Sequence, residues 1–437
     1  MEIPFWILLP FIAMLLCIAI APLVIEKRWE KNLNKFCVSM VLGSIVAIWM
    51  VANNTAENQF THKLIHQMVY DYIPFILLLT ALFVVTGGIK VNGDIQATPK
   101  VNTFILAIGF VLASLMGTTG AAMLLIRPLI ATNSQRKYTT HTILFFIAIV
   151  ANCGGLLTPL GDPPLFLLYL RGAEFTWFTT LIPVWVFVGI CLLVIYYFLD
   201  SYYYKKREAL GNLIEDAANI TPISFGGLIN LCWLLAVIMS VMFINSGYIP
   251  AMGEEHAPFY IKLLREFVLI AIIILSLVTT KKSVREANHF SWEPIVEVAV
   301  LFVGIFATMT PALIYLNTNA ASMGLTEPWQ FYYSTGLLSS FLDNAPTAVA
   351  FHSVATGLPV VEGVPVVAGI QEVLLKVIAV ASVFFGAMTY IGNGPNFMVK
   401  AIAERSGVPM PSFFGYICKF SLVVLLPLYI IAQIIFF

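Results

Sequence analysis

The chain alternates long apolar runs with short polar connections over its whole length. Several runs are close to the roughly 20 residues that an α-helix needs to cross the hydrocarbon core of a bilayer. They lie near 5–25, 36–52, 72–89, 178–199, 225–246, 266–280, 294–316 and 413–437. This pattern predicts an all-α polytopic membrane protein, with the lipid bilayer as its surroundings.

Four shorter apolar runs form two pairs around polar tips. Runs 101–116 and 120–131 are joined by Gly117–Gly120, and runs 329–342 and 345–356 are joined by Asp343–Pro346. Each pair is too short to cross a bilayer twice. The pattern predicts two re-entrant hairpins, at 101–131 and 329–356, whose tips lie inside the membrane.

Two other apolar segments are interrupted by prolines, glycines and polar residues. The stretch 152–166 reads Asn-Cys-Gly-Gly-Leu-Leu-Thr-Pro-Leu-Gly-Asp-Pro-Pro-Leu-Phe, and its acid is Asp162. An irregular backbone at this depth persists only where protein or a cavity satisfies its polar groups. An acid inside the membrane indicates a functional site. The sequence therefore predicts broken transmembrane helices at 142–170 and 372–404.

The second interruption resembles a copy of the first. Thr158 and Asp162 correspond to Thr389 and Asn393 at a constant spacing, and Gly161 corresponds to Gly392. Interrupted helices at matching positions in two halves are typical of secondary transporters, whose inverted repeats place the binding site at the interruptions. We assign the first repeat to 1–200, a cytoplasmic linker to 201–222 and the second, inverted repeat to 223–437.

Lysine and arginine are unevenly distributed between the predicted loops. With the N-terminus outside, the cytoplasmic loops contain sixteen of these residues and the outside loops contain four. Cytoplasmic loops are enriched in Lys and Arg. We therefore expect an integral protein of a bacterial inner membrane with its N-terminus outside.

Composition excludes other classes. Hydrophobic residues make up 60% of the chain and charged residues only 11%, whereas a soluble domain has about 25% charged residues. The formal net charge of zero argues against a nucleic-acid partner. The apolar segments contain no nucleophile–base pair or metal cluster, so we expect neither an enzyme nor a cofactor. A channel would not need interrupted inverted repeats.

The segment 154–164, Gly-Gly-Leu-Leu-Thr-Pro-Leu-Gly-Asp-Pro-Pro, resembles the ion transporter superfamily. That superfamily includes NhaD-type sodium/proton antiporters, citrate–metal transporters, arsenite permeases and sodium–dicarboxylate carriers. The segment 339–346, Ser-Ser-Phe-Leu-Asp-Asn-Ala-Pro, is similar to the hairpin tip of the NhaD-like and citrate transporter branch. The resemblance implies a homodimer and an elevator-like carrier, in which a scaffold holds a moving transport region. At the first tip, Gly117–Gly120 stands where such antiporters have Asp-Asn.

Oxygen-bearing side chains at the tips and interruptions form the candidate site. Sodium prefers oxygen ligands, which hydroxyls, amides, carboxylates and unwound carbonyls supply. The candidates are Asn152, Thr158, Gly161, Asp162, Thr118 and Thr119 in the first half, and Asp343, Asn344, Thr389 and Asn393 in the second. A sodium site, if present, is expected at Asp162 and Asp343. The N-termini of the half-helices would also point partial positive charge at this centre, which suits an anion.

Other roles remain open for these residues. Asp162 and Asp343 could cap half-helices, Thr118 and Thr119 could bond the backbone in a turn, and Asn152 could join two helices. Glu297, within the span 294–316, and His352, in the outgoing arm of the second hairpin, are possible proton carriers.

Two functions fit the candidate site. In sodium/proton antiport, Asp162 and Asp343 would bind sodium or protons in turn. In sodium- or proton-coupled uptake of a small carboxylate such as citrate, the acids would hold the cation, while helix dipoles and hydroxyls would hold the anion. The sequence favours antiport, because two carboxylates inside the membrane suit cation chemistry and no cationic side chain is placed at the tips.

Overall fold

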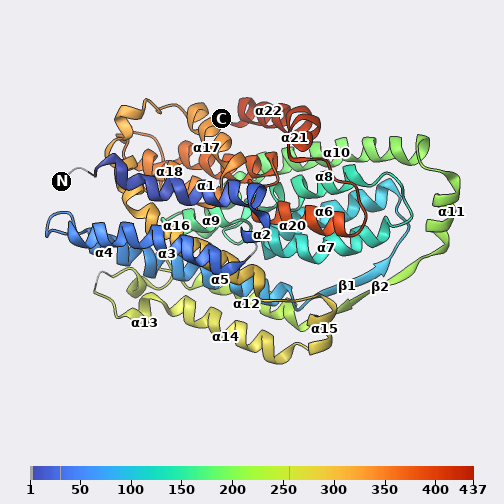
Figure 1. The fold of residues 1–437 in the computed structure, drawn as a ribbon, viewed down its shortest axis with the longest axis horizontal. Helices are drawn as coiled ribbons and strands as arrows, with labels where there is room; N and C mark the ends of the chain where they lie inside the picture. The colour runs from blue at the N-terminus through green and yellow to red at the C-terminus, as the bar shows by residue number, and fades with distance from the viewer. Residues whose placement is uncertain (1–2, 30, 255) are drawn as a thin grey trace.

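The computed structural model describes residues 3–29, 31–254 and 256–437, and most of these residues are helical (Figure 1). Within this part of the chain, eight helices are long and apolar enough to cross a membrane. They run mainly along the long axis of the molecule, which is horizontal in Figure 1. The predicted all-α polytopic membrane fold is confirmed, and the protein is an integral membrane protein.

The spanning helices are uninterrupted or contain a short 3-10 or π-helical turn. Six of the eight consist of η1 Phe5–Leu8 with α1 Leu9–Val24, α3 Asn32–Ala52, α4 Phe60–His66 with η2 Gln67–Tyr72 and α5 Ile73–Thr86, η4 Phe175–Leu181 with α10 Ile182–Lys206, α16 Glu293–Thr318, and α21 Phe413–Tyr416 with η8 Ile417–Leu425 and α22 Leu426–Phe436. The other two, Pro99–Met116 and Thr140–Leu157, belong to the first hairpin and the first broken helix described below. Helices α12 Ile229–Phe243 and α14 Leu264–Thr279 are shorter. Further short helices are α2 Glu26–Trp29, α11 Leu210–Ala218, η5 Pro250–Met252, α13 Phe259–Lys262, α15 Lys282–Ala287 and η6 Ala320–Met323.

The two predicted hairpins are present as helix pairs. Helix α6, Pro99–Met116, turns at Gly117 into α7, Thr118–Thr132. Gly117 has a φ of 82°, which a residue without a Cβ adopts at little cost. Helix α17, Pro328–Phe341, is followed after two residues by α18, Asn344–Thr356. Because each tip consists of only one or two residues, it is small enough to lie between other helices.

The two predicted broken helices are also confirmed. Helix α8, Thr140–Ile149, gives way to the 3-10 turn η3, Cys153–Leu157, and resumes as α9, Pro163–Leu170. Helix α19, Glu372–Phe384, gives way to η7, Phe385–Met388, and resumes as α20, Gly394–Arg405. Proline at the first turn of α9 and of α20 favours a helix start there, because that turn has no use for the missing N–H.

The hairpins and broken helices of the two halves pack crosswise. Arm α18 of the second hairpin packs against α9, and arm α7 of the first hairpin packs against α20. This exchange brings the two tips and the two interruptions to the middle of the molecule. It supports the predicted inverted repeats, although their boundaries at 1–200 and 223–437 stay a prediction.

The segment predicted as a linker, 201–222, is more ordered than a simple connection. Helix α10 continues through its start to Lys206, and α11 follows. Strand β2, Thr221–Gly226, then pairs antiparallel with β1, Lys90–Asp94, at the right end of Figure 1. A second small hairpin, β3 Val366–Val367 with β4 Ile370–Gln371, precedes α19.

Candidate functional site

Four half-helices begin close to one another in the middle of the molecule. These are α7 at Thr118, α9 at Pro163, α18 at Asn344 and α20 at Gly394. The N-terminus of a helix carries a partial positive charge, equivalent to about half an elementary charge. The centre at which the four helices meet is therefore favourable for negative charge.

Asp162 lies at this centre and accepts hydrogen bonds from both halves. The Thr118 hydroxyl donates to Oδ1 at 2.8 Å, and Asn393 Nδ2 donates to the same oxygen at 3.1 Å. Asn344 Nδ2 donates to Oδ2 at 2.5 Å. The carboxylate is buried, and these charge-assisted bonds stabilise it there. It thereby joins the two hairpin tips to both broken helices.

A chain of asparagine amides connects the two interruptions. Asn393 Nδ2 also donates to Asn152 Oδ1 at 3.1 Å, and Asn152 Nδ2 donates to Asn396 Oδ1 at 2.7 Å. Asn396 Nδ2 donates to the carbonyl oxygens of Gly386 and Thr389 at 2.8 and 2.9 Å. These amides satisfy carbonyls that the broken helix leaves without a helical partner.

The two threonines at the interruptions make equivalent bonds to the hairpins. The Thr158 hydroxyl donates to the Ser114 carbonyl oxygen on α6, and the Thr389 hydroxyl donates to the Ser340 carbonyl oxygen on α17. Each hydroxyl fastens an interruption to the hairpin of its own half. In this structure neither donates its hydroxyl proton to a group at the centre.

Gly161 and its counterpart allow the irregular backbone to fold closely on itself. A Cβ at position 161 would lie 1.9 Å from the Gly155 carbonyl oxygen. A Cβ at Gly392 would lie 2.6 Å from the Gly386 carbonyl oxygen. The backbone N–H of Thr118 also donates to the Gly161 carbonyl oxygen at 2.8 Å. Gly161 is thus a packing position that supports the first tip.

Asp343 has a different position from Asp162. Its Oδ1 accepts the Ala345 N–H at 2.9 Å, so it is the N-cap of α18. In the first hairpin the corresponding N-cap is Gly117, which has no side chain to cap α7. The two tips therefore differ chemically, and they also differ in backbone, because Gly117 has a φ of 82° and Asp343 a φ of -56°.

A cavity lies next to the tip of the first hairpin, where Gly117 provides no side-chain cap. Its volume is about 90 Å³, and it is lined by Thr118, Thr119, Gly120, Gly161 and apolar side chains of α5 and α16. A second cavity of about 60 Å³ is also lined by Thr119 and Gly120 and extends to the loop 288–291. Of the two threonines at this tip, Thr118 donates its hydroxyl to Asp162, whereas Thr119 lines both cavities.

The chain matches a family model over its whole length, residues 1–437, and the description of that family is "Putative citrate transport". The chain belongs to this family. A comparison with curated proteins finds no match. Membership makes the protein a membrane transporter, consistent with the predicted superfamily.

The citrate transport family fits one predicted function better than the other. Sodium/proton antiport, which the sequence favours, receives no support from the family description, whereas carboxylate uptake matches it. The two proposed proton carriers lie outside the centre. Glu297 forms an ion pair with Lys35 of α3 at 2.6 Å, and His352 Nε2 donates to the Ala368 carbonyl oxygen at 2.9 Å.

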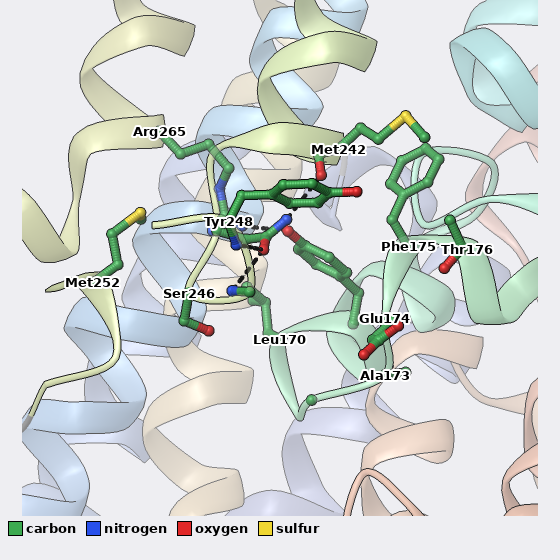
Figure 2. Close-up of a pocket in the computed structure, with 14 residues that line it drawn as sticks. Leu170, Ala173, Glu174, Phe175, Thr176, Met242, Ser246, Tyr248, Met252 and Arg265 are labelled. Atoms are coloured by element: carbon green, nitrogen blue, oxygen red, sulfur yellow. Dashed lines mark hydrogen bonds between the residues drawn. The ribbon is translucent and has the colours of Figure 1, made fainter. Parts of the chain in front are cut away.

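A larger cavity at the left end of the molecule is lined by the end of α9, the start of α14 and neighbouring loops. Figure 2 shows its side chains, which include Arg265, Tyr248 and Glu174. The guanidinium of Arg265 is held by Glu266 at 2.6 Å and by the Tyr169 hydroxyl at 3.3 Å. Its charge is therefore neutralised within the protein, and this cavity lacks the converging half-helices.

Sequence reasoning missed several supporting residues of the centre. They are Ser114 and Ser340, whose carbonyl oxygens accept the threonine hydroxyls, and Gly155 and Gly386, whose carbonyl oxygens lie against the glycines of the interruptions. The signal was present, because Gly155 and Gly386 have the same spacing as Thr158 and Thr389.

Proposed function

We propose that this protein carries citrate or a related small polycarboxylate across the membrane, coupled to sodium ions or protons. The proposal agrees with the family description and with the partial positive charge at the four half-helix N-termini. It names both the substrate class and the region of the chain that would bind it.

The observation that carries the proposal is the unequal capping of the two hairpin tips. Helix α18 has its own carboxylate cap, Asp343, while α7 has Gly117 at the same place. The first N–H groups of a helix have no partner within the helix. In α7, Thr118 N–H bonds Gly161, and the next two residues, Thr119 and Gly120, line the cavity. A carboxylate of the substrate would cap α7 as Asp343 caps α18.

The surroundings of this cavity would strengthen the interaction. Leu79, Leu82, Met116 and Ile295 line it beside the tip. An apolar, weakly polarisable wall increases the energy of a charge–dipole interaction relative to water. The hydroxyl of Thr119 offers one further donor to the substrate.

Asp162 would act as the fixed centre of the site. Its two oxygens accept three hydrogen bonds, so it is less available as a direct ligand of a cation. It would instead hold Thr118 and Asn344, and with them both tips, in the geometry that binds the substrate. This role differs from the exchange of sodium for protons that antiport requires.

Uptake of labelled citrate into proteoliposomes tests the proposal. We expect uptake that requires an inward gradient of sodium or protons, and loss of uptake in Thr119→Asp, because the added carboxylate repels the substrate. The matched control Thr119→Asn, which is neutral and similar in size, should keep most of it. Absence of gradient-driven uptake for a panel of di- and tricarboxylates would contradict the proposal. Sodium-dependent proton flux without any organic solute would favour antiport instead.

A further inference from the structure

A further polar cavity lies beside α4, which is at the left of Figure 1. Its volume is about 630 Å³. It is open to the outside and is bordered by α4 and η2, by α16, by the end of α9 and by α18. None of the residues that hold Asp162 lines it, so it is distinct from the centre described above.

The charged and titratable groups of this cavity are mostly basic. Lys63 and Arg171 bring two positive charges, and His62, His66 and His352 bring three imidazoles. The acid that faces them is Asp71, and Arg171 Nη2 lies 3.5 Å from its Oδ2. One acid for two permanent cations leaves the cavity with an excess of positive charge.

Gln67 provides a buried donor without a partner. Its side chain is 7% exposed, and Nε2 has no hydrogen-bond partner in the part of the chain that the structure describes. Arg171 can only donate, so the Gln67 atom that faces it at 3.5 Å is Oε1. The amide group is therefore oriented with its N–H donors directed elsewhere. An unpaired buried donor is unfavourable, and an acceptor on a ligand would satisfy it.

His352 provides a buried acceptor without a partner. It is 4% exposed, and its Nε2 bonds the Ala368 carbonyl oxygen at 2.9 Å. A carbonyl oxygen only accepts, so Nε2 carries the proton and Nδ1 of the neutral ring has a free lone pair. Among the described residues Nδ1 has no hydrogen-bond partner. A hydroxyl group of a ligand would satisfy it.

We propose that this cavity is a second anion site, which binds a hydroxy-polycarboxylate beside α4, apart from the first cavity. The carboxylates would bind Lys63 and Arg171. A small side-chain shift on binding would bring the amide of Gln67 and Nδ1 of His352, whose atoms have almost no exposed surface in the free protein, into contact with a carboxylate and the hydroxyl, respectively. The inference deepens the proposed function and rests on it for the substrate class. The site would hold the substrate before or after it passes the Asp162 centre.

Protection of an introduced cysteine tests this site without any transport. Thr356 lines the cavity and is exposed, so Thr356→Cys, in full-length protein with its native cysteines changed to serine, can be labelled by a maleimide. We expect citrate to slow the labelling of this protein in lipid nanodiscs. Tricarballylate, which is citrate without the hydroxyl, should protect at a concentration at least several-fold higher.

Two changes in the cavity should weaken protection by citrate. Gln67→Leu and His352→Phe each remove one proposed partner, and each should raise the half-protecting concentration roughly tenfold, which corresponds to the loss of about 1.4 kcal/mol of binding energy. Gln433→Leu on α22 is the matched control and should leave it unchanged. Asp162→Ala, at the other centre, should also leave protection unchanged.

The outcomes separate this inference from the proposed function. Citrate uptake without protection of Thr356→Cys, protection that Asp162→Ala abolishes, or equal protection by citrate and tricarballylate would each overturn the second site as proposed. Protection that depends on Gln67 and His352 in a protein that transports no carboxylate would support the site and contradict the proposed function.

Discussion

At the scale of single residues, the centre is organised by one acceptor among donors. Thr118, Asn344 and Asn393 all donate to Asp162, and they come from three separate elements. All three donors are buried, so removing the acceptor leaves unpaired groups rather than solvated ones. The arrangement explains why an acid is placed where the cost of burial is high.

Replacing the acceptor should therefore abolish transport. In Asp162→Ala three donors lose their partner, and in Asp162→Asn an amide N–H₂ would face another donor. We expect citrate uptake to fall roughly 100-fold or more in both, since each unpaired donor costs about 1–3 kcal/mol. Glu404→Gln, which changes an exposed acid of α20, is the matched control. Near-normal uptake by Asp162→Asn would contradict the role given to this residue.

Most residues of the centre could be predicted from the sequence, but their hydrogen-bond partners could not. Asp162, Asn344, Asn393 and Thr118 were predicted because they are polar groups in apolar surroundings. The bonds of Thr158 and Thr389 to hairpin carbonyls could not be predicted, because which backbone oxygen lies within reach depends on how the hairpin packs. The same holds for Asp343, whose capping of α18 was one of two open roles.

At the scale of elements, the interruptions depend on close backbone contacts. Gly161 lies against Gly155, and the first tip bonds the Gly161 carbonyl oxygen through Thr118 N–H. A side chain there would push the interruption away from the hairpin and disturb the N-terminus of α7.

We therefore expect Gly161→Ala to impair folding and uptake. Its Cβ would meet a backbone oxygen at 1.9 Å, and overpacking of this kind costs about 1–3 kcal/mol or more. Gly394→Ala is the matched control in the other interruption, because nothing lies within 4 Å of a Cβ at that position. Thermal unfolding of the two purified variants checks the difference. Equal melting temperatures would show that the contact has no consequence.

A buried ionic cluster holds the base of the first hairpin against two other helices. Asp200 of α10 accepts from Arg136 at 2.6 Å and from His141 of α8 at 2.9 Å. Asn102 of α6 donates to the same carboxylate at 3.3 Å. The cluster fixes the hairpin at the end away from its tip.

Loss of the acid in this cluster should destabilise the protein. Asp200→Ala leaves Arg136 buried without its main partner, and breaking a buried pair costs about 3–5 kcal/mol. Lys282→Ala, which removes an exposed ion pair to Glu286 on α15, should cost less than about 1 kcal/mol. Denaturant unfolding in detergent measures both. A small effect in Asp200→Ala would indicate that the cluster relaxes.

The elements were predicted from apolar patterning more accurately than their ends were. The apolar runs that begin at 120 and 345 belong to helices that begin at Thr118 and Asn344, because polar residues can also occupy the first turn of a helix. The strand pair of β1 and β2 was not predicted, since it joins segments far apart in the sequence and each strand is short.

At the scale of the whole molecule, the predicted cytoplasmic linker lies at one end. Its helix α11 is at the right end of Figure 1, whereas α4 and α13 are at the left. The homodimer and the elevator-like movement that the resemblance implies stay predictions.

The orientation of the protein can be measured with single cysteines in a background without native ones. Gly211→Cys in α11 should react with an impermeant maleimide only in inverted membrane vesicles, because Lys and Arg residues keep that end in the cytoplasm. Ala321→Cys in η6, at the other end, should react only in intact cells. The reverse result would mean that the N-terminus is inside.

The structure of the protein in lipid nanodiscs with saturating citrate tests the central claim most directly. Our account predicts density for a carboxylate at the N-terminus of α7, in contact with Thr119 and Gly120, while Asp162 keeps its bonds to Thr118, Asn344 and Asn393. Citrate bound away from this tip, or continuous helices through 150–162 and 389–393, would contradict it.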